Sequence, residues 1–420
     1  MRARVVPGLA AALALALPFA VGAADPGHGS LDQAFGNGGI VTTAIGRWSE
    51  ADALVIQPDG KLLVAGETSG DRVSPWCAFA LVRYNPDGSL DTDFGKGGEV
   101  TTAGPYGCSS VDALVLQPDG KLVAAGFSEQ TSTKRSVGLL VRYNPDGSID
   151  RSFGTRGKVV TADAGIGLVL QPDGKLVTAG SSGPESATQF VLVRYTARGV
   201  LDRTFGKQGK VTTHDGEYAC CPGSPIAQPD GKLILPGYSS EGNPMFRYNP
   251  NGSLDRSFGK GGKVTMGIDP QALALQHNGR IVVVGTDIPS PDYKGVNMFA
   301  VARYNRNGTR DPSFGEGGEV YTAIGDRYGN GSQANSVAIQ PDGKIVAAGY
   351  SDDGATLARY LPNGALDRTF GKGGIVTTSI PPCCAIVTAL AVQPDGSLVA
   401  AGHRSIDNDR GTIALARYVP

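Results

Sequence analysis

Three short phrases recur along the whole chain and constrain its fold more than any other feature. The first is the turn phrase Gln-Pro-Asp-Gly, whose copies are 48 to 64 residues apart. It starts at Gln57, Gln117, Gln171, Gln228, Gln340 and Gln393, with a degenerate copy at Gln276-His277-Asn278-Gly279. Internal repeats at this spacing indicate units that stack into a single body.

The other two phrases recur in step with the first. Leu-Asp-x-x-Phe-Gly starts at Leu31, Leu90, Leu201, Leu254 and Leu366, with variants at Ile149 and Arg310. An Arg-Tyr pair starts at Arg83, Arg142, Arg194, Arg247, Arg303, Arg359 and Arg417. Since the phrases keep their form while their spacing varies, the insertions must fall in the loops between them.

Each repeat contains four strand-like runs separated by turns. In the first repeat they cover residues 52–57, 61–66, 79–84 and 99–102. The first two runs are apolar on both faces, as expected for strands sandwiched between neighbouring sheets. Four antiparallel strands per repeat predict an all-β, seven-bladed β-propeller. A β-solenoid is the competing fold, but hairpin turns within each unit argue against it.

The phase of the repeat predicts how the ring closes. The chain opens with a fourth-type strand at residues 40–43 and ends with a third-type strand at 413–418. We therefore expect residues 39–43 to complete the last blade, built from residues 388–418. This pairing would hide both open sheet edges.

The first 24 residues look like a signal peptide. Arg2 and Arg4 precede an apolar stretch at residues 9–21, and small residues follow at Ala23 and Ala24. We expect residues 25–420 to form one domain, secreted or periplasmic, with no membrane span. Without the two arginines of the signal peptide, the chain has 36 basic and 39 acidic residues. It therefore lacks the excess of positive charge that is typical of nucleic-acid-binding proteins.

The two longer phrases resemble the delta-60 repeats of bacterial exported proteins. The similarity rests on Leu-Asp-x-x-Phe-Gly-x-x-Gly and Gln-Pro-Asp-Gly-Lys and covers almost all of the mature chain. The resemblance implies a β-propeller and export. It implies no active-site residues.

Function is expected where the repeat breaks. A catalytic residue is needed once, so the Arg, Asp and Phe that recur in every unit are interpreted as structural. In a four-stranded meander, the turns after the first and third strands share one face, called here the turn face. The loops after the second and fourth strands share the other, the loop face. Irregular segments such as 67–76, 103–110 and 127–137 fall on the loop face, where binding sites are usual.

All six cysteines are expected on the loop face. The preferred disulfide is Cys77–Cys108, because their loops should be neighbours in adjacent blades. The adjacent pairs Cys220-Cys221 and Cys383-Cys384 leave two options, strained bonds within each pair or bonds between the two loops. No metal site is expected, since no Cys-x-x-Cys spacing occurs.

A partial polar ring is predicted at the channel mouth on the loop face. Its members begin the first strand of their units, and His403 adds polar character in the last unit. The predicted ligand-binding residues are Asp52, Asp112, Gln271, Asn335, Thr388 and His403.

These residues suggest a binding or interaction propeller for a small polar ligand, a glycan or a protein, with no cofactor. The alternative is a propeller hydrolase or lyase that acts on carbohydrate or another polar substrate. It would use Asp52 and Asp112, if their carboxylates came within about 10 Å of each other. A purely structural scaffold is a third reading.

Overall fold

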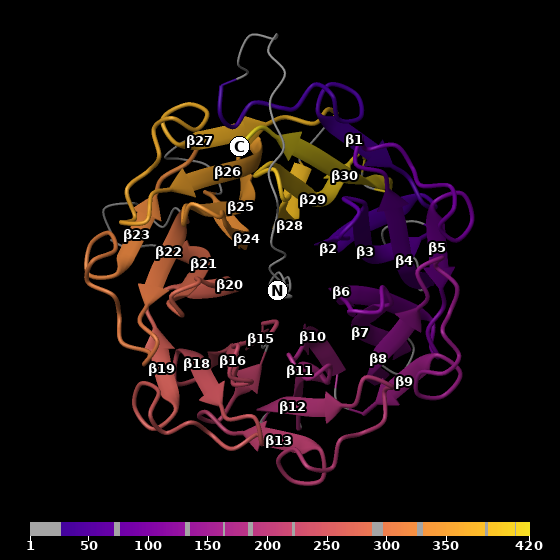
Figure 1. Ribbon diagram of the computed structural model, residues 1–420, viewed down its shortest axis with the longest axis vertical. Helices are drawn as coiled ribbons and strands as arrows, with labels where there is room; N and C mark the ends of the chain where they lie inside the picture. Colours follow the sequence, from indigo (N-terminus) through magenta and orange to yellow (C-terminus); the bar gives the residue numbers. More distant parts are fainter. Residues whose placement is uncertain are drawn as a thin grey trace.

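The fold is a ring of seven four-stranded antiparallel sheets around a central axis (Figure 1). The computed structural model describes residues 27–70, 76–130, 135–162, 164–183, 188–220, 223–287, 297–325, 331–382, 385–407 and 409–420. In each sheet the first strand lies nearest the centre and the fourth lies at the rim (Figure 1). The predicted seven-bladed, all-β propeller is confirmed.

Blades 1 to 4 follow one another along the chain. Blade 1 contains β2 (Trp48–Ile56), β3 (Leu62–Ser69), β4 (Cys77–Tyr84) and β5 (Glu99–Thr102). Blade 2 contains β6 (Cys108–Leu116), β7 (Leu122–Gln130), β8 (Arg135–Tyr143) and β9 (Lys158–Thr161). Blade 3 contains β10 (Ala164–Leu170), β11 (Leu176–Ser182), β12 (Gln189–Tyr195) and β13 (Lys210–Thr213). Blade 4 contains β15 (Ile226–Ala227), β16 (Leu233–Pro236), β18 (Asn243–Tyr248) and β19 (Lys263–Met266), beside the short pair β14 (Ala219–Cys220) and β17 (Tyr238–Ser239).

Blades 5 to 7 complete the ring. Blade 5 contains β20 (Asp269–Leu275), β21 (Ile281–Asp287), β22 (Met298–Tyr304) and β23 (Glu319–Thr322). Blade 6 contains β24 (Gln333–Ile339), β25 (Ile345–Ser351), β26 (Gly354–Tyr360) and β27 (Ile375–Thr378). Blade 7 contains β28 (Ala385–Val392), β29 (Leu398–Ser405), β30 (Gly411–Tyr418) and β1 (Ile40–Thr43).

The hydrophobic core lies between blades rather than within one of them. One face of blade 1, with Leu54 and Val64, packs on Val399 and Leu415 of blade 7. Its other face packs on blade 2. Both faces of each inner strand are therefore buried, which explains why the sequence shows no alternation there. Each fully buried aliphatic side chain contributes roughly 1.5–3 kcal/mol.

The two ends of the chain close the ring as predicted. β1 pairs antiparallel with β30, and Ile40 lies opposite Ala416 while Thr43 lies opposite Ile413. The Arg417 Nε donates to Asp32 Oδ2 at 2.8 Å. In blade 6, the Gly371 amide donates to the His28 carbonyl at 2.8 Å. The equivalent glycine amide of the other blades donates to a carbonyl in the turn after the third strand of the next blade.

Several strands extend further toward the loop face than the sequence predicts. β6 begins at Cys108 and β7 runs to Gln130, within segments expected to be irregular loops. The ladder continues because Cys108 pairs with Glu129 and Ser109 pairs with Ser128. No helix in the described part of the chain is long and apolar enough to cross a membrane.

Candidate functional site

The repeated residues form the same structural contact in every blade. In blade 1, Arg83 Nε lies 2.6 Å from Asp91 Oδ2, and the guanidinium carbon lies 4.6 Å from the Phe94 ring centroid. Lys61 reaches the same carboxylate at 2.8 Å, and the Arg83 Nη1 donates to the Pro145 carbonyl of blade 2. The seven Arg–Asp pairs are Arg83–Asp91, Arg142–Asp150, Arg194–Asp202, Arg247–Asp255, Arg303–Asp311, Arg359–Asp367 and Arg417–Asp32.

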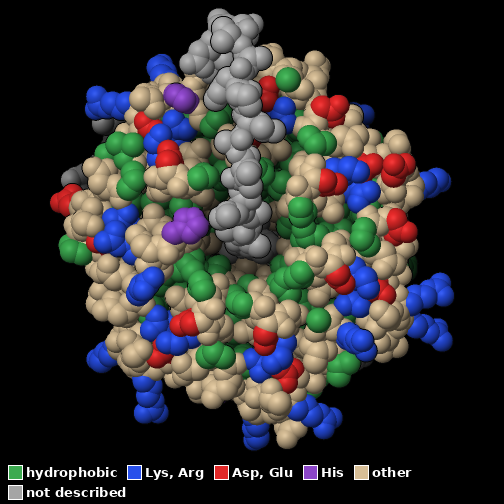
Figure 2. Space-filling view, in the orientation of Figure 1, with side chains coloured by type: hydrophobic (Ala, Val, Ile, Leu, Met, Phe, Trp, Pro, Cys, Tyr) green, Lys and Arg blue, Asp and Glu red, His purple; other side chains and the backbone are tan. Residues whose placement is uncertain are grey.

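In the six pairs other than Arg417–Asp32 the pKa of the carboxyl is lowered, so these groups are unsuited to proton transfer at neutral pH. Burial alone would raise the pKa of Asp202, but hydrogen bonds from Thr204 and the charge of Arg194 outweigh it and lower the pKa to about 2. The same balance sets the pKa of Asp367 at about 2. A general acid or base works best with a pKa near the operating pH. The repeated aspartates are therefore structural, and Figure 2 shows acidic and basic side chains grouped together around the disc.

The predicted polar ring coincides with a ring of β-bulges. In six blades the register between the first and second strands skips one residue. A bulge leaves that residue unpaired in the ladder and re-aims its side chain. The skipped residues are Asp52, Asp112, Ile166, Gln271, Asn335 and Thr388, which include five of the six predicted ligand-binding residues.

Two bulge residues hydrogen-bond to the next blade. The Asn335 Nδ2 donates to the Val387 carbonyl at 2.8 Å. The Thr388 Oγ1 donates to the Ala51 carbonyl at 2.5 Å. Each acceptor is the residue just before the bulge of the following blade. These side chains therefore link blades at the channel wall.

The third linked bulge residue contacts the preceding blade instead. The Gln271 Nε2 donates to the Tyr238 hydroxyl at 3.0 Å, and that hydroxyl donates to the Pro270 carbonyl at 3.0 Å. Gln271 is thus also part of a contact between blades.

Asp52 and Asp112 differ from these residues in their chemistry. They are 2% and 5% exposed, and they occupy the bulges of the neighbouring blades 1 and 2. Both are carboxyl side chains, whereas the residues at the same position of blades 6 and 7 are the amide Asn335 and the hydroxyl Thr388. The structure thus places two acidic positions side by side in the ring.

His403 lies away from the bulges, on β29. It is half-buried and pairs across the sheet with Ile386 and Ile413. Its ring centroid is 6.5 Å from that of Trp48, the first residue of β2. His403 therefore lies at the contact between blades 7 and 1.

Blade 1 carries a like-charge pair that sequence analysis missed. Glu50 lies directly opposite Glu67 in the β2–β3 ladder, two residues before the Asp52 bulge. The Trp48 Nε1 donates to Glu50 Oε1 at 2.8 Å. The equivalent pairs in blades 2, 5, 6 and 7 are Ser110–Phe127, Asp269–Thr286, Gln333–Tyr350 and Ile386–His403.

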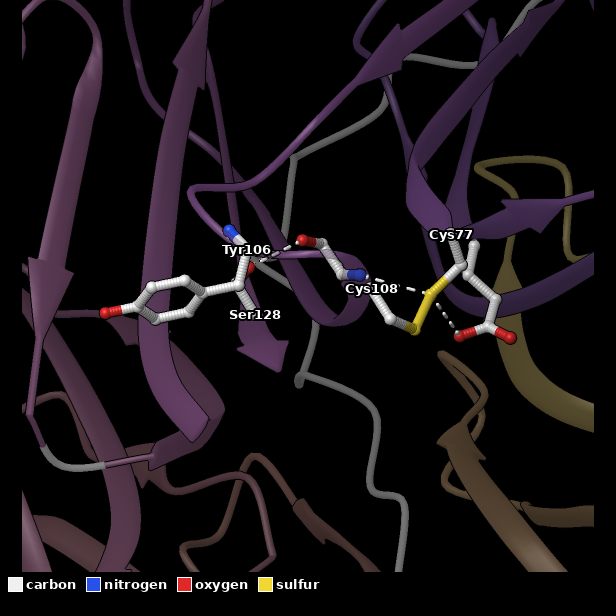
Figure 3. Close-up of a disulfide and its surroundings, with 6 residues drawn as sticks. Cys77, Tyr106, Cys108 and Ser128 are labelled. Carbon is white, nitrogen blue, oxygen red and sulfur yellow. Dashed lines mark hydrogen bonds between the residues drawn. A yellow bond between two sulfur atoms is a disulfide. The ribbon is translucent and has the colours of Figure 1, made fainter. Parts of the chain in front are cut away.

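The predicted disulfide Cys77–Cys108 is confirmed, with a Cα–Cα distance of 4.3 Å (Figure 3). It joins the start of β4 in blade 1 to the start of β6 in blade 2. The Ser109 amide lies 3.1 Å from Cys77 Sγ. Trp76, directly before Cys77, is 71% exposed, and Tyr106 is half-exposed, with its ring directed away from the disulfide (Figure 3).

These features lie on two neighbouring blades and are called here the blade 1–2 group. We define the group as Glu50, Asp52, Glu67, Trp76, Tyr106 and Asp112. They belong to the loop-face half of two adjacent blades that the disulfide joins. The group combines carboxylates with two aromatic side chains that are at least partly accessible.

The remaining cysteines leave their predicted pairing untested. Cys220 is half-buried in β14, and the Tyr218 hydroxyl donates to its sulfur at 2.7 Å. Cys221, Cys383 and Cys384 lie outside the described residues, as does the predicted signal peptide.

One group of residues has the composition of a metal site. Ligand atoms of Glu67, Cys77 and Cys108 lie within 4.8 Å of one another. Thiolates are the form of cysteine that binds metal, and here the disulfide occupies both sulfur atoms. The oxidised protein therefore does not offer a zinc-type thiolate centre at this position.

A repeated glycine is the signal that could have revealed the bulges. A Cβ on Gly66 would lie 2.1 Å from the Glu50 carbonyl oxygen, and one on Gly349 would lie 1.9 Å from the Gln333 carbonyl oxygen. The bulge pushes this carbonyl over the second strand, where only glycine fits. Glycine recurs opposite the bulge at Gly66, Gly126, Gly285, Gly349 and Gly402.

The sequence matches one protein family, described as "Domain of unknown function (DUF5122) beta-propeller". The matched segments are residues 57–94, 117–153, 171–205, 228–258, 276–314 and 340–370, just over half of the chain. The chain belongs to this family. Each segment in this DUF5122 propeller starts at the glutamine of the turn phrase and ends at the phenylalanine that packs against the Arg–Asp pair.

Solved structures with the same fold include two lyases. The DUF5122 propeller aligns with a catalytically inactive virginiamycin B lyase from Staphylococcus aureus, crystallised with quinupristin, at a TM-score of 0.51 and 10% identity, covering 90% of this chain and 98% of that one. It also aligns with the polysaccharide lyase Uly1 at a TM-score of 0.50 and 12% identity, covering 90% and 92%. At these identities the likeness shows the fold alone. None of the curated protein sequences matches this chain.

Proposed function

We propose that this DUF5122 propeller is a binding module that holds a hydroxyl-rich polar ligand, a glycan, at the blade 1–2 group. The observation that carries the proposal is the Glu50–Glu67 pair, two acidic side chains directly opposite each other, which differs in type from the equivalent pairs of blades 2, 5, 6 and 7. Such a local departure from the repeated pattern points to a role outside folding. The repeated Arg–Asp pairs are already used in joining blades.

The chemistry of the group suits a sugar. Carboxylates accept hydrogen bonds from hydroxyl groups, and an indole offers a flat apolar face with a polar edge. Trp76 lies beside Cys77, so the disulfide ties its position to blade 2. Tryptophan is a type of side chain that anchors binding interfaces.

We further propose that the protein acts outside the cytoplasm. The Cys77–Cys108 disulfide supports this location, because such bonds persist in oxidising compartments. The predicted signal peptide at residues 1–24 agrees with it. We also assign the repeats to the delta-60 class, on the phrases that resemble it.

The test is a glycan array probed with the mature protein. Trp76→Ala, Asp52→Asn and Asp112→Asn should each weaken binding at least tenfold. The matched controls are Tyr218→Ala, an aromatic residue 44% exposed near blade 4, and Asp119→Asn on the turn face; both should bind as the wild type does. Equal binding by wild type and all three test variants would refute the assignment.

The enzymatic alternative rests on Asp52 and Asp112 in neighbouring bulges, since bulges often re-aim side chains at active sites. It is tested by incubating polysaccharides with the protein and measuring new reducing ends and ultraviolet-absorbing unsaturated products. Turnover by the wild type that is lost in both Asp→Asn variants would replace the binding proposal with a hydrolase or lyase. Binding without turnover supports the binding module.

A further inference from the structure

The two turns of blade 5 carry a different charge from those of the other blades. In blade 1, residues 57–61 and 83–91 contain two basic and three acidic residues, a net charge of −1. The equivalent residues of blade 5, 276–280 and 303–311, contain four basic residues and one acidic residue, a net charge of +3. This is the most positive of the seven copies; the next, blade 3, reaches +1.

The same turns enclose a shallow cavity of ≈ 480 Å³ on the turn face. Its walls come from both turns of blade 5, so the altered residues and the cavity coincide. The lining residues are Asn278, Arg280, Asn305, Arg306, Asn307 and Thr309. A cavity of this volume is within the usual range for small-molecule sites.

Two asparagines preserve the turn while removing negative charge. The Arg280 amide donates to Asn278 Oδ1 at 3.0 Å, just as the Lys61 amide donates to Asp59 Oδ1 at 3.2 Å in blade 1. The Thr309 amide donates to Asn307 Oδ1 at 3.1 Å in the same way. Each asparagine keeps the accepting oxygen and replaces the second carboxylate oxygen with an amide donor.

Arg306 takes the place of a proline in this cavity. In blade 1 the ring of Pro86 lies over Gly60, whereas in blade 5 the Arg306 side chain lies over Gly279. The Arg306 Nε donates to the Asn278 carbonyl at 2.6 Å, which holds the guanidinium between the two turns. A guanidinium has five N–H donors in a planar fork, and this bond uses one of them.

The positive charge of the cavity is only partly neutralised. One carboxylate, Asp311, faces both Arg280, at 3.2 Å, and Arg303, at 2.7 Å. The pKa of Arg303 is lowered, mainly by burial. The charge of Asp311 raises this pKa and the charge of Arg280 lowers it, but burial has the larger effect. Arg310 is paired with Glu319 at 2.9 Å, so it adds little net charge.

We propose that this cavity binds the oxyanion group of an acidic saccharide. Arg280 and Arg306 hold the carboxylate or sulfate, whose planar or tetrahedral oxygens match the guanidinium fork. The side-chain amides of Asn278 and Asn307 donate to neighbouring sugar oxygens. A saccharide is favoured over a free ion because neutral donors surround the charged ones in a cavity larger than an inorganic anion.

The site is independent of the blade 1–2 group, because it lies on the turn face. Calorimetric titration of the mature protein with a uronic-acid oligosaccharide, a sulfated oligosaccharide, a neutral oligosaccharide of equal length and sodium sulfate tests it. Binding of an acidic oligosaccharide should weaken as salt rises and should exceed that of the neutral one, which only the blade 1–2 group is proposed to hold. The same titrations are made in Trp76→Ala, in which binding at the blade 1–2 group is weakened, so that the salt-dependent binding that remains reports on this cavity.

A reverted variant is the decisive comparison. Asn278→Asp, Arg306→Pro and Asn307→Asp together restore residues that other blades use at these positions, and should weaken binding at least tenfold. Arg306→Gln is a second variant that removes one charge without introducing a proline. Asn251→Asp, the same substitution in the blade 4 turn, is the matched control and should bind normally.

Three results would overturn the proposal. The first is equal affinity of the reverted variant, with Arg306→Gln also unaffected. The second is an equal loss in the Asn251→Asp control, which would show a general charge effect. The third is sodium sulfate binding as tightly as either acidic oligosaccharide, which would assign the cavity to a free anion.

Discussion

At the scale of single residues, the arginine of the repeated Arg–Asp pair makes three interactions: an ion pair, a contact with an aromatic ring and a hydrogen bond to the next blade. Arg194 pairs with Asp202, lies 4.5 Å from the Phe205 ring centroid and donates to the Pro250 carbonyl of the next blade. A buried charge is tolerated only when it is paired and hydrogen-bonded. Such demands leave little freedom for the same residues to serve catalysis.

Removing one partner of a buried pair should cost more than removing one from the partly exposed pair Arg417–Asp32. Asp202→Ala leaves Arg194 and Lys175 facing each other and should lower the free energy of unfolding by about 3–5 kcal/mol. Asp32→Ala removes a side chain that is 25% exposed and should cost about 1 kcal/mol. Urea denaturation of both variants checks this, and equal losses would contradict it.

The low pKa values of these aspartates predict acid sensitivity. Asp202 and Asp367 have pKa values of about 2, compared with about 3.9 in an unfolded chain. A lowered folded-state pKa gives stability that is present above the unfolded value and is lost as pH falls through the folded value. Urea melts should therefore show stability falling from about pH 4 to about pH 2. A smaller pH slope is expected in Asp202→Asn, and an unchanged slope would count against this origin.

At the scale of elements, the bulge and its opposing glycine form one device. The bulge turns the residues at 271, 335 and 388 toward neighbouring blades, and the glycine makes room for the displaced carbonyl. A hairpin without the bulge would leave these side chains in the alternating pattern of the strand.

Alanine at this glycine should be poorly tolerated. In Gly349→Ala the new Cβ would meet the Gln333 carbonyl oxygen at 1.9 Å, so backbone must move. We expect a loss of at least about 3 kcal/mol in unfolding free energy. The control is Gly174→Ala, a turn glycine with φ of 82° and no atom near its Cβ, which should cost only about 1–2 kcal/mol. Similar costs at both positions would refute the steric argument.

The disulfide should stabilise the joint between blades 1 and 2. Cys77 and Cys108 are separated by 31 residues, so the chain-entropy model predicts a contribution of about 3–4 kcal/mol. Cys77→Ser with Cys108→Ser should lower the melting temperature by several degrees and weaken glycan binding through Trp76. Calorimetry under oxidising conditions measures the first effect, and unchanged binding would separate the disulfide from the site.

At the scale of the molecule, closure depends on residues from both ends of the chain. β1 supplies the fourth strand of blade 7, and the Tyr84 hydroxyl of blade 1 donates to Thr43 of β1 at 2.8 Å. Without β1, the edge of β30 would expose a row of unpaired backbone groups.

Deleting residues 25–46 should therefore open the ring and cause self-association. Size-exclusion chromatography should show oligomers or aggregate, together with a lower melting temperature. A circular permutant that links the natural ends and begins between β27 and β28 retains all seven sheets and should remain monomeric and folded. A monomeric, stable deletion variant would show that closure does not need β1.

Sequence alone determined the blade number, the strand order, the closure and the Cys77–Cys108 bond. These follow from the residues of the turns and from the phase of the repeat, and both can be read from short stretches of sequence. The Arg–Asp and Phe contacts could be anticipated for the same reason, because every copy repeats them.

Only the tertiary structure decided what surrounds the irregular positions. Three findings depend on register and on contacts between strands or blades. Asn335 and Thr388 bond to the next blade, and Glu50 lies opposite Glu67. Arg306 takes the place of a proline over Gly279. A one-residue bulge changes the direction in which a side chain points, and the local sequence pattern does not predict that direction. The candidate sites follow from this geometry, whereas the ring that holds them follows from the repeat.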